Sequence, residues 1–181
     1  MYKISMVALA LIASQVTADS LEVNNQYAEL DILYFSSPGD FDGEQTLGLT
    51  LGYQWSEKHA FETELQINGL DSQKFGFDAD ADLVSYLLGY RYNFNPSSEF
   101  RYFAGVGLGY TQAEYFVDPT NKAEQSLIMP FARIGVDYDF SPNAYVSAEF
   151  RYQHIPDIDK HEVHYEIGSV PVVGISIGYR F

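Results

Sequence analysis

Histidines and acidic residues gather in one stretch near the C-terminus, where they could bind a metal ion. The segment from His154 to Glu166 reads HIPDIDKHEVHYE. Within it, His161, His164 and Glu162 supply the nitrogen and oxygen ligands that a divalent cation accepts. Histidines three residues apart also occur in many solvated loops. We therefore predict no metal and no other cofactor, and keep these three residues only as weak candidates.

A serine and a histidine flank the same stretch and could form a nucleophilic pair. Acyl-transfer chemistry needs a hydroxyl, a base beside it and an acid that orients the base. His154 and Ser169 have the first two residue types, and Glu166 or Asp157 could be the third. A serine and a histidine near one loop are common, so we predict no catalytic residues.

A third set of ionisable residues recurs at every second position of several alternating stretches. Its members are Glu29, Asp31, Glu62, Glu64, Arg91, Arg101, Arg133, Asp137, Glu149, Arg151 and Arg180. Arginines and carboxylates that share a narrow interior must pair, because an unpaired buried charge is costly. We predict that this set forms a salt-bridged network that fills the interior.

The elements that would position these residues are eight strands. We predict them at 27–35, 45–55, 59–68, 82–94, 100–111, 127–140, 144–154 and 170–181. The connections alternate in length. Those at 36–44, 69–81, 112–126 and 155–169 are long, and those at 56–58, 95–99 and 141–143 are short and have turn-forming residues. This order predicts an all-β fold, an eight-stranded antiparallel up-and-down barrel.

The two faces of these strands differ in composition. In the last strand, Val173, Ile175, Ile177 and Tyr179 share one face, and the corresponding row of every predicted strand has no charged residue. The opposite row holds the charged set and most of the strand glycines, which predicts a crowded interior without room for a Cβ atom. A charge at the midplane of a membrane barrel costs about 2–4 kcal/mol, so the charge-free row is predicted to face lipid. The alternative is a soluble lipocalin-like barrel with the two faces reversed.

Aromatic residues cluster at the strand ends, as expected at the two interfaces of a bilayer. The predicted interface residues next to the short turns and the C-terminus are Tyr53, Trp55, Tyr92, Phe94, Tyr102, Tyr138, Phe140, Tyr179 and Phe181.

The chain has the features of an exported protein. Lys3, an apolar run and Val16-Thr17-Ala18 predict a signal peptide at 1–18, which leaves the barrel domain at 19–181. The 181 residues include no cysteine, so disulfides and thiolate metal sites are excluded. A net charge of −15 argues against a nucleic-acid partner.

Three segments carry a resemblance to a known family: Gly-Tyr-Arg-Tyr-Asn-Phe at 89–94, Tyr-Phe-Ala-Gly-Val-Gly-Leu-Gly-Tyr at 102–110 and Gly-Ile-Ser-Ile-Gly-Tyr-Arg-Phe at 174–181. With the terminal Phe, the chain resembles the small OmpA/OmpX-type outer-membrane barrels, which belong to the broad porin-like family. The resemblance covers roughly residues 27–181.

The resemblance implies a location in the outer membrane of a Gram-negative cell, with long loops extracellular and both termini periplasmic. The implied partners are outer-membrane lipid, lipopolysaccharide and the barrel-assembly machinery, which would recognise the C-terminal strand. A structural or surface-interaction role follows, with an extracellular ligand or host surface bound through the long loops.

Three alternatives stay open. One is a narrow ion or solute channel through the charged interior. A second is a lipid A-modifying enzyme built on His154 and Ser169, although no local motif of the deacylase or palmitoyl-transferase families matches. A third is transport of small hydrophobic molecules, which the charged, glycine-rich inner row disfavours.

Overall fold

The computed structural model describes residues 26–36, 45–72, 79–118, 121–160, 163–165 and 168–181. No helix in this part of the chain is long and apolar enough to span a membrane. The strands are β1 (Gln26–Phe35), β2 (Gln45–Ser56), β3 (His59–Ser72), β4 (Ala79–Asn93), β5 (Phe100–Asp118), β6 (Asn121–Asp139), β7 (Ala144–Ile155), β8 (Ile158–Lys160), β9 (Val163–Tyr165) and β10 (Gly168–Arg180).

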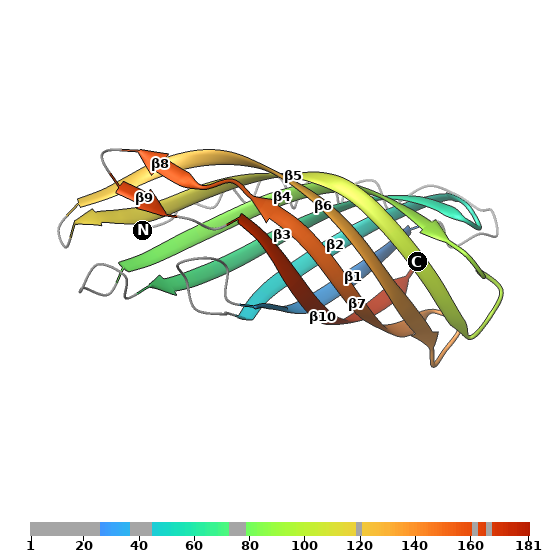
Figure 1. Ribbon diagram of the computed structural model, residues 1–181. Helices are drawn as coiled ribbons and strands as arrows, with labels where there is room; N and C mark the ends of the chain where they lie inside the picture. Colours follow the sequence, from blue (N-terminus) through green and yellow to red (C-terminus); the bar gives the residue numbers. More distant parts are fainter. Residues whose placement is uncertain (1–25, 37–44, 73–78, 119–120, 161–162, 166–167) are drawn as a thin grey trace.

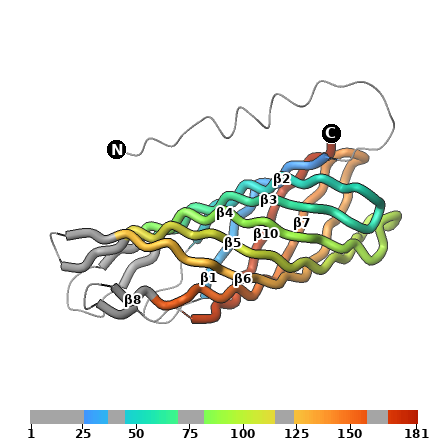
Figure 2. Tube along the Cα trace, turned by 90° about the horizontal axis from the view of Figure 1, so that it is seen from above, coloured from blue at the N-terminus to red at the C-terminus, as the bar shows by residue number. Residues whose placement is uncertain are grey.

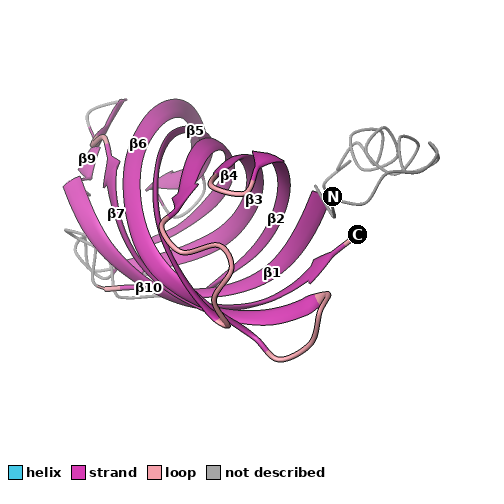
Figure 3. Cartoon of the chain, turned by 90° about the vertical axis from the view of Figure 1, so that its right-hand side faces the viewer, coloured by secondary structure: helices cyan, strands magenta, loops and turns pink. Residues whose placement is uncertain are grey.

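Eight of these strands close into one antiparallel barrel, which confirms the predicted fold class (Figure 2, Figure 3). From β1 to β7, each strand pairs with the next strand in the sequence, and β10 pairs with β7 and with β1. The barrel closes where β1 pairs with β10, from Tyr27 opposite Arg180 to Phe35 opposite Val172. Among the described residues, the short β8 and β9 pair with each other as a two-stranded sheet in the connection between β7 and β10.

The alternation of side chains follows the two-residue period of the strands. In β4, Leu87 points inward and is 2% exposed, whereas Leu88 points outward and is 66% exposed. Ile175 in β10 is 69% exposed. None of the charge-free row predicted to face lipid is buried in the structure. The barrel therefore has an apolar outer surface and a polar interior, the reverse of a soluble barrel.

Four strands extend further than the sequence predicted. Residues 69–81 and 112–126 were expected to be long loops, but β3, β4, β5 and β6 continue through most of them. The error has a physical cause. In β5 the outer row changes from Leu108 and Tyr110 to Gln112 and Glu114, so the apolar outer row that marks each predicted strand ends although the backbone ladder continues.

These four strands form an extension beyond the rest of the barrel, on the left of Figure 1. We call it the strand extension and define it as residues 68–72, 79–83, 112–118 and 121–126. Residue pairs join it from Ser72 opposite Ala79 to Asp118 opposite Asn121.

Two prolines stand where a neighbouring strand ends. In β6, Pro130 lies one residue beyond Phe131, the last residue that pairs with β7. In β10, Pro171 lies one residue beyond Val172, the last that pairs with β1. Proline cannot donate a ladder hydrogen bond, so it is tolerated at such positions. Each proline helps to end the pairing there.

Candidate functional site

The interior of the barrel gathers the charged residues singled out in the sequence. All of them except Glu149 are no more than 8% exposed, and the side chain of Glu149 is 9% exposed. A further acid, Asp139, points the same way with its side chain 26% exposed. Burial at this level makes pairing obligatory, and the pairs extend through the interior.

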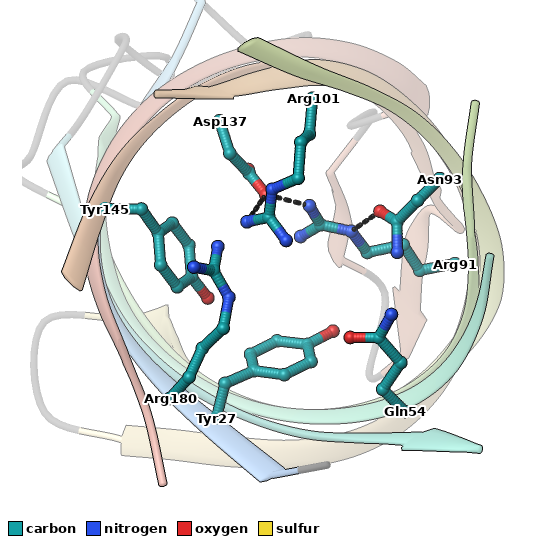
Figure 4. A pocket seen from close by; sticks show the side chains of 8 residues that line it. All are labelled: Tyr27, Gln54, Arg91, Asn93, Arg101, Asp137, Tyr145 and Arg180. Carbon is teal, nitrogen blue, oxygen red and sulfur yellow. Dashed lines mark hydrogen bonds and ion pairs between the residues drawn. The ribbon is translucent and has the colours of Figure 1, made fainter. Parts of the chain in front are cut away.

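Asp137 lies at the centre of the half that is near the short turns. Its carboxylate accepts hydrogen bonds from Arg91 and from Arg101, whose Nη2 lies 2.8 Å from Oδ2. Arg101 also pairs with Asp139 at 3.3 Å, and Arg180 pairs with that carboxylate at 2.8 Å. Figure 4 shows the three arginines pointing into the interior beside Asp137.

Arg91 carries the network across the barrel. Its Nη1 lies 3.4 Å from Glu29 and 3.5 Å from Glu62. Two tyrosine hydroxyls also donate hydrogen bonds to these carboxylates. Tyr27 donates to Glu62 at 2.5 Å, and Tyr145 donates to Glu29 at 2.6 Å. Each carboxylate is therefore held by both an arginine and a phenol.

The network continues toward the strand extension through two more arginines. Arg133 pairs with Glu62 and, at 3.1 Å, with Glu149. Arg151 then joins Glu149 to Glu64, with both nitrogen–oxygen distances at 2.8 Å. One connected series of ion pairs thus runs from the turn end to the middle of the barrel.

Aromatic rings fill the space between these charges. Four inward rings each cover a glycine at the directly paired position of the next strand: Tyr27 covers Gly52, Phe103 covers Gly135, Phe131 covers Gly107 and Tyr145 covers Gly178. A Cβ atom at Gly178 would lie 2.6 Å from Cε1 of Tyr145, closer than two carbons can approach. The crowded interior predicted from the one-sided glycines is confirmed.

A small cavity remains at the turn end of the network. It holds about 10 Å³ and is lined by Tyr27, Gln54, Arg91, Asn93, Arg101, Asp137, Tyr145 and Arg180 (Figure 4). This is roughly the space of one water molecule. The cavity is too small to admit a solute.

The other candidate residues lie outside the interior. His154 and Ser169 are directly opposite each other in β7 and β10, and His154 Nδ1 lies 3.1 Å from Ser169 Oγ on the exposed face. Of the metal candidates, His161 and Glu162 lie outside the described residues, and His164 belongs to β9. Among the described residues, no three His, Cys, Asp or Glu side chains gather as a metal site would require.

The predicted interface aromatics lie on the outer surface near the short turns. Tyr92 and Phe94 have ring centroids 5.1 Å apart, and Tyr179 and Phe181 have centroids 5.4 Å apart. Trp55 packs against Phe61 at 4.4 Å. Together they form part of a ring around one end of the barrel.

The sequence prediction missed some interior residues. Asp139 and the rings of Tyr27, Phe103, Phe131 and Tyr145 share the inward parity of the charged set, so reading the whole inward row would have found them. The sequence could not predict which charged group each of these residues contacts, because those contacts depend on the register between strands.

Comparisons with solved structures agree with this architecture. Neisserial surface protein A is 18% identical, with a TM-score of 0.65 over 87% of this chain and 97% of that chain. OprG from Pseudomonas aeruginosa is 16% identical, with a TM-score of 0.60 over 88% and 99%. Ail from Yersinia pestis is 13% identical, with a TM-score of 0.53 over 86% and 96%. At these low sequence identities, the TM-scores establish a shared fold and nothing further.

No curated protein matches the sequence. A family model does match, and its description is outer membrane protein beta-barrel domain. The match spans residues 4–181, which includes every strand of the barrel and the whole ion-pair network. The chain therefore belongs to the family of outer membrane protein beta-barrel domains.

Proposed function

We propose that this outer membrane barrel does not conduct solutes and serves a structural or surface-interaction role. In the proposed orientation the short turns and both termini face the periplasm, and the strand extension faces the outside of the cell. Residues 1–18 would act as the signal peptide. The barrel-assembly machinery would recognise β10, and lipopolysaccharide would surround the outer half.

The connected ion-pair network is the observation that carries this proposal. An eight-stranded barrel has an interior only just wide enough for its own side chains. Here five arginines, their carboxylates and four aromatic rings occupy it, and the cavity at the turn end holds only about 10 Å³. A solute would have to displace these paired charges in order to pass.

The strand extension supports a surface role. Asp82, Glu114 and Glu124 stand at directly paired positions of β4, β5 and β6, all on the outer face. Ail has been solved with the heparin analogue sucrose octasulfate, a highly anionic ligand. The net charge of −15 in the present chain favours a basic partner over an anionic one, because like charges repel.

Recording from planar bilayers that contain the purified wild-type protein tests the proposal. We expect no steady current steps, since ion pairs and rings fill the interior. Discrete steps whose size follows the salt concentration would establish the narrow-channel alternative and overturn the proposal. Migration of the same sample as a compact band before boiling is the control for a folded barrel.

The contact between His154 and Ser169 favours a second candidate, an enzyme that modifies lipid A. On the outer face of β7 and β10, the pair follows directly after the paired residues Tyr152 and Pro171. This position is near the level where lipid acyl chains would meet the headgroups. If the second candidate holds, overexpression changes the mass spectrum of lipid A, and His154→Ala or Ser169→Ala abolishes the change. The proposed non-catalytic role predicts identical spectra with the wild-type protein, either variant and an empty vector.

A further inference from the structure

Among the described residues, one interior carboxylate has no positively charged partner. The charged set in the interior has six carboxylates and five arginines, and ion pairs join five of these carboxylates to the arginines. Asp31 forms no ion pair with any described residue, although it is only 5% exposed. Thr50 donates a hydrogen bond to it at 2.8 Å, which leaves its charge uncompensated. Asp139, outside this set, is 26% exposed and can remain hydrated. A buried charge without a countercharge is costly, so the interior has one negative charge to neutralise.

The arginines in this part of the interior are already shared between other carboxylates. Nη2 of Arg151 lies 2.8 Å from both Glu64 and Glu149. Arg133 pairs with Glu149 at 3.1 Å and also with Glu62. Two arginines therefore serve three carboxylates here. Neither has a charge to spare for a fourth, so a further negative group in this region needs a countercharge from outside the chain.

Two carboxylates converge over Gly48, in the middle of the wall formed by β1, β2 and β3. Gly48 is directly paired with Asp31 of β1 on one side and with Gln66 of β3 on the other. Asp31 Oδ2 lies 3.1 Å, and Glu64 Oε1 3.2 Å, from the place where a Cβ atom of residue 48 would stand. Because glycine has no side chain, both negative groups can approach this one position.

The neighbouring side chains add buried oxygen atoms that lack partners. Gln66 is fully buried and donates its Nε2 to Glu64 at 2.6 Å, but its Oε1 has no hydrogen-bond partner among the described residues. The same holds for Thr46 Oγ1 and Asn68 Oδ1, on side chains that are 1% and 4% exposed. Polar atoms buried in proteins are normally paired, so these oxygens indicate a bound ion or water. Water would satisfy them but would leave the charge uncompensated.

We propose that one monovalent alkali cation, Na⁺ or K⁺, binds in the interior beside Gly48, held by Asp31 together with oxygens of Glu64 and Gln66. Carboxylate, hydroxyl and amide oxygens are hard ligands, and the site has no nitrogen or sulfur ligand for a transition metal. A single positive charge balances the one carboxylate that lacks an arginine. Arg151, which contacts Glu64, opposes a divalent ion at the same place. The site stabilises the fold whether or not the barrel conducts.

Urea unfolding in buffers of constant ionic strength tests the site, with NaCl or KCl replacing the chloride of N-methylglucamine, a cation too large to enter. For the wild type, we expect the unfolding equilibrium constant to fall roughly tenfold for each tenfold rise in Na⁺ or K⁺ above the dissociation constant, as one ion bound to the folded state requires. Asp31→Asn keeps the shape but removes the charge, so its unfolding should not depend on which cation is present. Glu29→Gln, on the same strand, is the matched control. Its carboxylate is held by Arg91 and Tyr145, and the variant should keep the dependence of the wild type.

Equilibrium dialysis of the folded wild type against radioactive Na⁺ or Rb⁺, a stand-in for K⁺, supplies a second test that needs no variant. We expect about one bound ion per chain at saturation. Wild-type stability that does not respond to Na⁺ or K⁺, an unchanged response in Asp31→Asn, or a response to Ca²⁺ alone would overturn the assignment. So would an infrared band of a protonated carboxylic acid that Asp31→Asn removes, because a proton would then neutralise this carboxylate in place of a cation.

Discussion

At the residue scale, the interior carboxylates differ in how well they are neutralised. Asp137 is fully buried and contacts two arginines, Arg91 and Arg101. Asp31 is 5% exposed and accepts a hydrogen bond from Thr50 at 2.8 Å, but it forms no ion pair with any described residue. Removing the charge should therefore have opposite consequences at the two sites.

Asp137→Asn is expected to lower the free energy of unfolding by about 3–5 kcal/mol, because it leaves two buried guanidinium groups without their shared carboxylate. Asp31→Asn should change it by no more than ~1 kcal/mol, or raise it, when Na⁺ and K⁺ are absent, since the charge removed then has no counter-ion. Urea unfolding followed by fluorescence of Trp55, the only tryptophan, measures both. Equal losses in the two variants would contradict this account of the network.

At the element scale, strand pairing is coupled to the rings inside the barrel. Gly178 in β10 stands directly opposite Tyr145 in β7, and the ring occupies the place of the missing Cβ atom. Gly69 in β3 is exposed, and a Cβ atom there would meet nothing within 4 Å. The same substitution at the two glycines separates the need for space from strand propensity.

Gly178→Ala should destabilise the barrel by about 1–3 kcal/mol, because the new methyl group forces the Tyr145 ring away from its hydrogen bond to Glu29. Gly69→Ala should stay within ~0.5 kcal/mol of the wild type. The midpoint of urea unfolding in the same lipid or detergent is the measurement. If Gly178→Ala proves as mild as Gly69→Ala, the interior is less crowded than the structure indicates.

At the scale of the whole molecule, the outer surface sets the position of the barrel in the membrane. Leu108 is 60% exposed in the apolar band of β5, and Tyr110 follows on the same face. Gln112 is the next outward residue and begins the strand extension. The boundary between lipid and water should therefore fall near Tyr110.

Leu108→Arg is expected to cost about 2–4 kcal/mol of folding free energy in a bilayer, because a charge is placed in the hydrocarbon. Gln112→Arg, four residues further along the same face, should cost about 0–1 kcal/mol near the interface. The fraction of compact unboiled band after refolding into vesicles across a urea series gives both values. A large cost for Gln112→Arg would place the membrane boundary beyond the start of the strand extension.

The sequence alone determined the architecture and the direction of each face. Period-two alternation is a local property, and each row must suit its own solvent, so a charge-free row and a charged, glycine-rich row predict a membrane barrel without knowledge of any contact. The arginines and carboxylates expected in the inner row follow the same alternation and are buried in the structure. The predicted ends of β3 to β6 were wrong because the apolar outer row ends before the backbone ladder does.

Only the tertiary structure decided which residues meet. Arg151 pairs with Glu64 across 87 positions of sequence, and Tyr145 covers Gly178 because β7 pairs with β10. Such contacts depend on the register of every strand, which is fixed by closing β1 onto β10 and therefore by the whole chain at once.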